Sequence, residues 1–106
     1  MFEPEVWVTV AQNDNYKVSN YGRIKNADTG RMMALRVNKD GHGGLYVRLN
    51  HNAIQVARYV SHIVGAAFLE GYDDRYVMVH QDGDLTNNHI DNLIQDYGRH
   101  KVSPRG

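Results

Sequence analysis

The chain has 106 residues with 12 basic and 12 acidic side chains, a length that fits one domain with a small core. The absence of cysteine excludes disulfides, thiolate zinc sites and cysteine nucleophiles, so any metal must be held by His, Asp, Glu or Asn. An apolar fraction of 42% argues against disorder, and no apolar run is long enough for a membrane helix. No secretory signal is visible, which fits a cytoplasmic protein.

The first half of the chain has the pattern of short strands separated by turns. Strands are expected at residues 16–19, 22–26, 31–37, 44–49 and 53–59. Apolar and polar residues alternate in the last two of these segments, as they do in half-buried antiparallel strands. The pattern predicts one antiparallel sheet from residue 16 to residue 59.

The hydrophobic period changes at residue 60. Apolar residues then recur at the spacing of one helix face: Val60, Ile63, Val64, Ala67 and Phe68. Gly71 follows just after this run, where helices commonly stop. The sequence therefore predicts one amphipathic helix near residues 60–69.

A strand-like run at 76–80 and a second one at 92–97 are expected to pair as a hairpin around a polar loop. The fold class predicted is α+β, with a small antiparallel sheet, one helix and this hairpin. We expect a single domain over 1–106, with a β region at about 5–59, a second segment at about 60–97 and a tail at 98–106.

Charge is unevenly distributed although the net charge is zero. Residues 11–65 carry eight basic and three acidic side chains, whereas residues 66–106 carry four and seven. A basic half could contact phosphates while an acidic half holds a cation. Ordinary surface charge explains the same numbers, so charge alone leaves both interpretations open.

The loop "VHQDGDLTNNHIDNL" at residues 79–93 concentrates histidine, aspartate and asparagine. His80 stands where a strand ends, a good position for a general base. The loop matches no calcium-binding helix–loop–helix signature and no zinc spacing. From the residues alone, a polar turn closed by Asn and Asp side chains is the favoured interpretation.

Two separated segments resemble a known family. The first, "EVW…YKVSNYGRIKN" at residues 5–26, resembles the nuclease-associated modular DNA-binding motif of phage homing endonucleases. The second, "SHIVGAAF…VMVHQDGDLTNNHIDNL" at residues 61–93, looks like the HNH endonuclease segment that usually follows this motif. The resemblance implies that the hairpin is a truncated form of the ββα-metal site, and that the β region binds double-stranded DNA.

The resemblance also implies roles for single residues. His80 matches the general base that activates water, and Asn92 matches the asparagine that braces the site and orients that histidine. The basic residues expected to contact DNA are Arg23, Lys25, Arg31, Arg36 and Lys39. The cofactor implied is one divalent ion, Mg²⁺ or Mn²⁺.

Two positions depart from the family pattern. The residue before the base is normally a metal ligand, but here it is Val79, which offers no ligand atom. The third motif position falls on Lys101, where Pro104 argues against a full helix. Asp82 and His100 are the remaining candidate ligands, although an Asx turn with Gly83 is the stronger interpretation of Asp82.

Two functions therefore follow from the sequence. The first is a small metal-dependent HNH endonuclease. The second is a catalytically degenerate descendant that binds DNA or a protein as a regulator or inhibitor, in the host cytoplasm if a phage encodes it. A homodimer and a host protein stay open as partners, and no membrane partner is expected.

Overall fold

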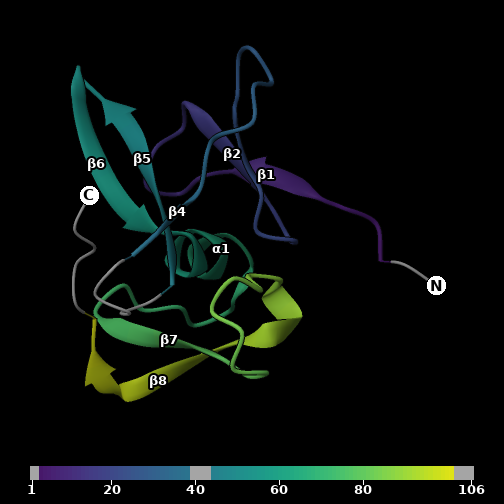
Figure 1. The fold of residues 1–106 in the computed structure, drawn as a ribbon, viewed down its shortest axis with the longest axis vertical. Coiled ribbons are helices and arrows are strands. Elements are labelled where there is room, and N and C mark those ends of the chain that lie inside the picture. Colours follow the sequence, from purple (N-terminus) through teal and green to yellow (C-terminus); the bar gives the residue numbers. More distant parts are fainter. Residues whose placement is uncertain (1–2, 39–43, 102–106) are drawn as a thin grey trace.

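The computed structural model describes residues 3–38 and 44–101, and no helix in those ranges is long and apolar enough to span a membrane. Helix α1 (Val60–Phe68) lies in the middle of the molecule. The strands of the first half lie on one side of it, and the hairpin of β7 (Tyr76–His80) and β8 (Leu93–His100) lies on the other, as Figure 1 shows.

The N-terminal strands β1 (Trp7–Thr9), β2 (Tyr16–Ser19) and β3 (Ile24–Asn26) form an antiparallel sheet in the order β1-β2-β3. Side chains alternate between its two faces, because successive residues of a strand point in opposite directions. Val18 and Ile24 are fully buried on the inner face, and Lys17 and Lys25 lie directly opposite each other on the outer face.

A second antiparallel sheet contains β4 (Arg36–Val37), β5 (Leu45–His51) and β6 (Ile54–Tyr59) in that order. The hairpin between β5 and β6 turns through Asn52 and Ala53, whose φ angles are 51° and 65°. Two positive φ angles in a two-residue loop are the signature of a type I′ turn, which matches the twist of the paired strands.

The expected single sheet is thus two three-stranded sheets. Within the described residues, the connection after β3 pairs with β3 through one isolated bridge, between Lys25 and Met32. Strand β4 then pairs with β5. The strand expected at residues 31–37 shrinks to the two residues of β4. Both are exposed, so no burial on either face favours a longer strand there.

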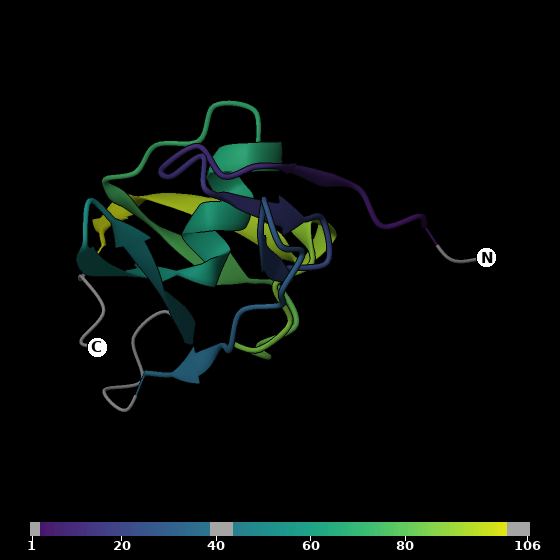
Figure 2. The ribbon, with the colours of Figure 1, turned by 90° about the horizontal axis from the view of Figure 1, so that it is seen from above.

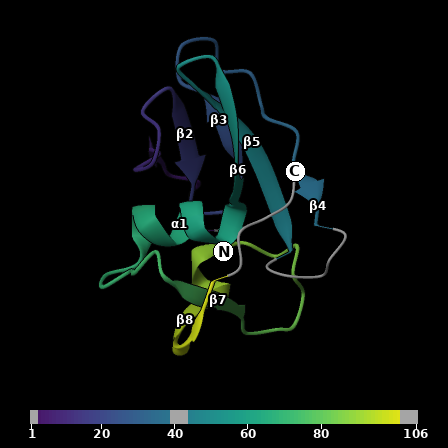
Figure 3. The same ribbon diagram turned by 90° about the vertical axis from the view of Figure 1, so that its left-hand side faces the viewer.

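The helix predicted from the change of hydrophobic period at Val60 is confirmed as α1. Val60, Ile63 and Val64 are fully buried, and Ala67 and Phe68 pack against the same core. No side chain caps the start of the helix. Packing therefore holds it in place, and Figures 2 and 3 show it crossing between the sheets and the β7–β8 hairpin.

The predicted hairpin is confirmed, with His80 paired to Leu93 at one end and Tyr76 to His100 at the other. Strand β8 continues three residues beyond the expected end at 97. A short 3₁₀ helix, η1 (Ile90–Asn92), leads from the polar loop into β8. The small antiparallel sheets, the single described helix and the hairpin agree with the α+β expectation.

One apolar cluster joins all these elements. It draws its buried side chains from both sheets, from α1 and from the hairpin: Val10, Tyr16, Val18, Ile24, Val47, Leu49, Val60, Ile63, Val64, Met78 and Leu93. Because the cluster includes Met78 and Leu93, the hairpin that carries His80 is anchored in the same core as the basic sheet.

Candidate functional site: His80 and the polar loop

His80 is the last residue of β7 and is 6% exposed. Its Nε2 lies 2.7 Å from Oδ1 of Asn88, which is itself only 2% exposed. When Nε2 carries the proton and donates to this oxygen, Nδ1 keeps the lone pair that a general base needs. Asn88 was not among the predicted site residues, although it belongs to the asparagine pair at positions 87 and 88 of the polar loop.

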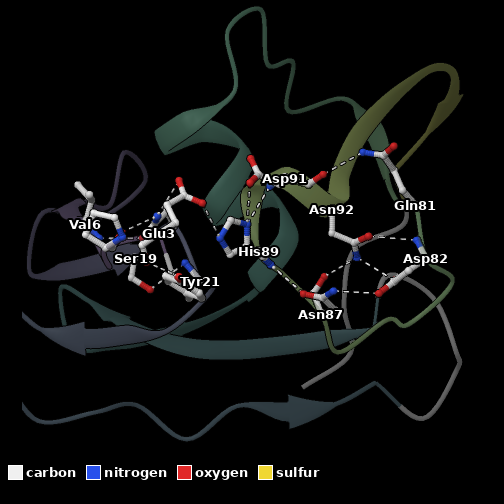
Figure 4. Close-up of polar contacts among 12 residues, drawn as sticks. Glu3, Val6, Ser19, Tyr21, Gln81, Asp82, Asn87, His89, Asp91 and Asn92 are labelled. Atoms are coloured by element: carbon white, nitrogen blue, oxygen red, sulfur yellow. Dashed lines mark hydrogen bonds and ion pairs between the residues drawn. The ribbon is translucent and has the colours of Figure 1, made fainter. Parts of the chain in front are cut away.

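Asn92 braces the loop from its far end, as Figure 4 shows. Its Nδ2 donates to Oδ1 of Asp82 and to the carbonyl of Asn87, both at 2.9 Å, and its Oδ1 accepts from the Asp82 backbone at 3.0 Å. The side chain therefore closes the loop between β7 and β8. The ring of His80 donates its hydrogen bond to the amide oxygen of Asn88, whereas the sequence led us to expect this contact from Asn92.

The carboxylate of Asp82 is occupied by hydrogen bonds within the loop. Its oxygens accept from the Asp84 backbone at 2.8 Å, from Asn87 Nδ2 at 2.9 Å and from Asn92 Nδ2. These bonds, the one from Asn87 first, hold the pKa of Asp82 below its usual range. The geometry is that of a turn-closing aspartate, which is the stronger of the two interpretations made from the sequence.

His100 lies at the wrong end of the hairpin to share an ion with His80. It pairs with Tyr76, and the two rings stand 5.0 Å apart. His80 lies four positions after Tyr76 along β7, a span of about 13 Å. The antiparallel register carries the two histidines of this hairpin apart, so the structure does not bring His100 to the side of His80.

A complete divalent-ion site does not form beside His80 from the described residues. Val79 is half-buried opposite Ile94 and brings no ligand atom. The one described group of three His and acidic side chains that could hold a metal is Glu3, His89 and Asp91. It lies where the loop meets the N-terminal segment (Figure 4) and does not include His80.

His89 is half-buried. Its Nε2 lies 3.2 Å from a carboxylate oxygen of Glu3, and the Tyr21 ring meets it edge-on at 4.5 Å. The backbone amide of Asp91 donates to its Nδ1 at 3.0 Å. These contacts attach the N-terminal segment to the polar loop, a link between positions too far apart for a local pattern to reveal.

The basic residues of the first half divide into restrained and exposed groups. Lys25 lies over the ring of Trp7 at 4.0 Å, and Arg23 is bound by Glu5, whereas Arg31 and Arg36 are exposed. Lys39 lies outside the described residues. Lys17 was not predicted as a contact, yet its position opposite Lys25 makes it part of the same outer face.

Comparison with known proteins agrees with this geometry. A family model described as the NUMOD4 motif matches residues 5–50. An uncharacterised HNH endonuclease of Acanthamoeba polyphaga mimivirus, L245, is 29% identical over 97 residues, which cover 92% of this chain and 28% of that protein. The DNA endonuclease I-HmuI of Bacillus phage SP01 is 33% identical over 81 residues, covering 74% of this chain and 44% of that protein.

A solved structure of I-HmuI, described as DNA binding and cleavage by that HNH homing endonuclease, superposes with a TM-score of 0.75. The identity there is 27%, and the match covers 86% of this chain and 52% of the other. The chain thus spans about half the length, or less, of the relatives it matches. The resemblance inferred from the two sequence segments is confirmed.

Proposed function

Because the chain carries a NUMOD4 motif and is homologous to HNH endonucleases, we propose that it binds double-stranded DNA and hydrolyses a phosphodiester bond with His80 as general base. The observation that carries this proposal is the hydrogen bond from His80 Nε2 to Asn88, which leaves Nδ1 free to take a proton from water. The DNA binding and cleavage described for I-HmuI supports it.

The outer face of the β1–β2–β3 sheet is the proposed DNA surface. Lys17 and Lys25 lie opposite each other there, and Arg23 follows the turn into β3. Like charges directly opposite each other on a sheet destabilise it, so their pairing favours a bound anion. A row of cations on one face suits the sugar–phosphate backbone, which supplies affinity without reading sequence.

This mechanism requires a divalent metal ion. A divalent ion such as Mg²⁺ or Mn²⁺ would neutralise charge on the reacting phosphate, but the described residues around His80 do not fit a full ligand set. A second copy of the chain could supply the missing ligand. We therefore expect slow cleavage from the isolated protein.

A DNA-binding protein without nuclease activity is the second candidate. Val79 favours it, because the position before His80 carries an apolar side chain packed opposite Ile94. The engaged carboxylate of Asp82 favours it too, since the loop uses that side chain for its own closure. Such a descendant would act as a regulator or as an inhibitor of a host enzyme.

Plasmid nicking with Mg²⁺ and with Mn²⁺ tests the two candidates. The variants are His80→Ala and a matched control, His51→Ala, which removes an exposed histidine in the β5–β6 turn. We expect slow, ion-dependent nicking that falls about 100-fold in His80→Ala and is kept in His51→Ala. DNA binding should survive in both variants, because the basic sheet is a separate element.

Each alternative result has a definite meaning. DNA binding without nicking under any ion would leave the second candidate. Nicking that survives His80→Ala would place the chemistry elsewhere in the chain. Absence of DNA binding by the wild type would remove the nuclease and leave a descendant that binds a protein.

A further inference from the structure

The turn of the DNA-binding motif is in direct contact with the polar loop that holds His80. The backbone amide of Ile90 donates to the carbonyl of Asn20 at 2.9 Å. Gly22 is buried at the same junction with a φ of +87°. A Cβ at Gly22 would stand 2.7 Å from Cβ of Asn88 and 3.1 Å from its carbonyl oxygen, so only glycine fits this approach.

Asn88 lowers the stability of the fold at that junction. Its Oδ1 is used by His80, but its Nδ2 is buried without a hydrogen-bond partner among the described residues. A buried unpaired donor costs about 1–3 kcal/mol. The stability of the loop therefore does not explain why an amide occupies this position, whereas the contact with His80 does.

We propose that Asn88 is the positioning residue of His80, and that Gly22 of the DNA-binding motif sets the place of Asn88. This inference rests on the proposed role of His80 as general base. The acceptor Oδ1 keeps the proton on Nε2 and turns the lone pair of Nδ1 toward the reaction. A reversed amide would put the donor Nδ2 against Nε2 and move the imidazole proton to Nδ1, where no lone pair is left.

The coupling follows from chain order. Gly22 is flanked by Tyr21, whose ring contacts His89, and by Arg23 at the edge of the basic sheet. The turn that meets Asn88 is therefore the same turn that begins the proposed DNA surface. The base and the DNA-binding motif share one rigid junction, with no linker between them.

The imidazole tautomer of His80 tests the first half of the proposal. Long-range ¹H–¹⁵N correlation spectra in mildly alkaline buffer report which ring nitrogen carries the proton of a neutral histidine. We expect the Nε2–H form in the wild type and in Asn88→Asp, which keeps an acceptor oxygen at the same place. Asn88→Ala should give a mixture of tautomers. A wild type with the proton on Nδ1, or an unchanged tautomer in Asn88→Ala, would overturn the role of Asn88.

Gly22→Ala tests the second half, with Gly30→Ala as its matched control. Both glycines have a positive φ, at +87° and +75°, so both substitutions carry the same backbone strain. A Cβ at Gly30 has no atom within 4 Å, whereas one at Gly22 collides with Asn88. We expect the His80 tautomer to change in Gly22→Ala alone. The same spectrum in both variants would contradict the role of Gly22.

Ile90→Pro is the second variant if Gly22→Ala does not fold. It removes the amide that donates to Asn20 at the first position of η1, where proline is tolerated. His89 before it is already extended, with φ −60° and ψ 136°, as a residue preceding proline prefers. A folded Ile90→Pro protein with an unchanged His80 spectrum would also contradict the coupling.

The spectra do not depend on cleavage, so the two proposals can fail separately. If the wild type never nicks DNA but shows the expected tautomers, the proposed function is wrong and Asn88 still positions His80. If the wild type nicks DNA, Asn88→Ala should lower kcat about 100-fold with KM nearly unchanged, and Asn88→Asp should recover part of that loss.

Discussion

Arg23 is the basic residue of the DNA-binding motif that the fold restrains most firmly. Its Nε and Nη2 donate to the two carboxylate oxygens of Glu5, with the Nε bond at 2.8 Å, and its guanidinium lies 5.5 Å from the centre of the Trp7 ring. The same guanidinium lowers the pKa of Glu5. Arg23 must leave this carboxylate before it can contact a phosphate.

Glu5→Gln should therefore tighten DNA binding. The pair is solvent-screened and weak, so we expect the gain in affinity to be no more than about fivefold. Fluorescence anisotropy with a labelled duplex measures it. The control is Glu70→Gln, which removes the same charge at an exposed position after α1. An equal gain in both variants would show that net charge, and no release of Arg23, is responsible.

At the level of single elements, the β1–β2–β3 sheet combines a buried apolar face with a cationic outer face. Lys17 and Lys25 are cross-strand neighbours, and Lys25 gains a contact with Trp7 that Lys17 does not share. Lys17 therefore repels Lys25 in the folded sheet, and its charge attracts the phosphates of any bound DNA. Its two effects have opposite signs and can be measured on one variant.

Lys17→Gln should weaken DNA binding and reduce the slope of log K against log salt by about 1, since one phosphate contact is lost. The free energy of unfolding should stay the same or rise by roughly 0.2–1 kcal/mol as the like-charge pair disappears. Arg99→Gln, on the hairpin, is the control and should leave the slope unchanged. A slope that responds to Arg99 and ignores Lys17 would move the DNA surface to the hairpin.

Helix α1 contains the second element-level feature, the buried His62. The Nδ1 of His62 lies 2.7 Å from the hydroxyl of Tyr72, which donates to Asp74 at 2.9 Å. Burial first, and then the charge of Lys101, lower the pKa of His62 to about 4. The folded protein thus holds this imidazole neutral.

Stability should therefore fall as pH decreases from about 6.5 to about 4. Over that window the unfolded chain binds a proton on His62 that the folded chain does not, which costs roughly 3 kcal/mol in full. Urea titrations at several pH values measure the effect. His62→Gln should flatten the curve in that window. A wild type with constant stability from pH 6.5 to 4.5 would show that His62 charges freely in the folded state.

At the level of the whole molecule, one core connects the basic sheet to the hairpin of His80. Ile63 of α1 is fully buried in it, between sheet residues such as Val18 and hairpin residues such as Met78. This arrangement supports the proposal that the described chain folds as one cooperative unit.

Ile63→Ala should lower the free energy of unfolding by about 2–5 kcal/mol, because it leaves a cavity at the centre of the core. Trp7 is the single tryptophan and reports on the N-terminal sheet by fluorescence, while the His80 resonances report on the hairpin. Both probes should shift to the same lower denaturant midpoint. Separate midpoints would mean that the sheet and the hairpin unfold independently.

Local patterns were sufficient for the helix, the hairpin and the family resemblance. The period at Val60 and the polar loop after His80 are read from neighbouring residues, because repeats of two or 3.6 residues follow from backbone geometry. The division into two sheets was not predicted, because the residues of one strand do not determine which other strand it pairs with.

The contacts that define the site depend on how distant segments meet. Asn88 reaches His80 across eight residues, Glu5 reaches Arg23 across 18, and Gly22 meets Asn88 across more than half of the chain. The antiparallel register also separates His100 from His80, although both histidines belong to one hairpin. Residue spacing determines on which face of its helix or strand a side chain lies. The shared core fixes which faces touch, and that is why the partner of His80 emerges only in the folded chain.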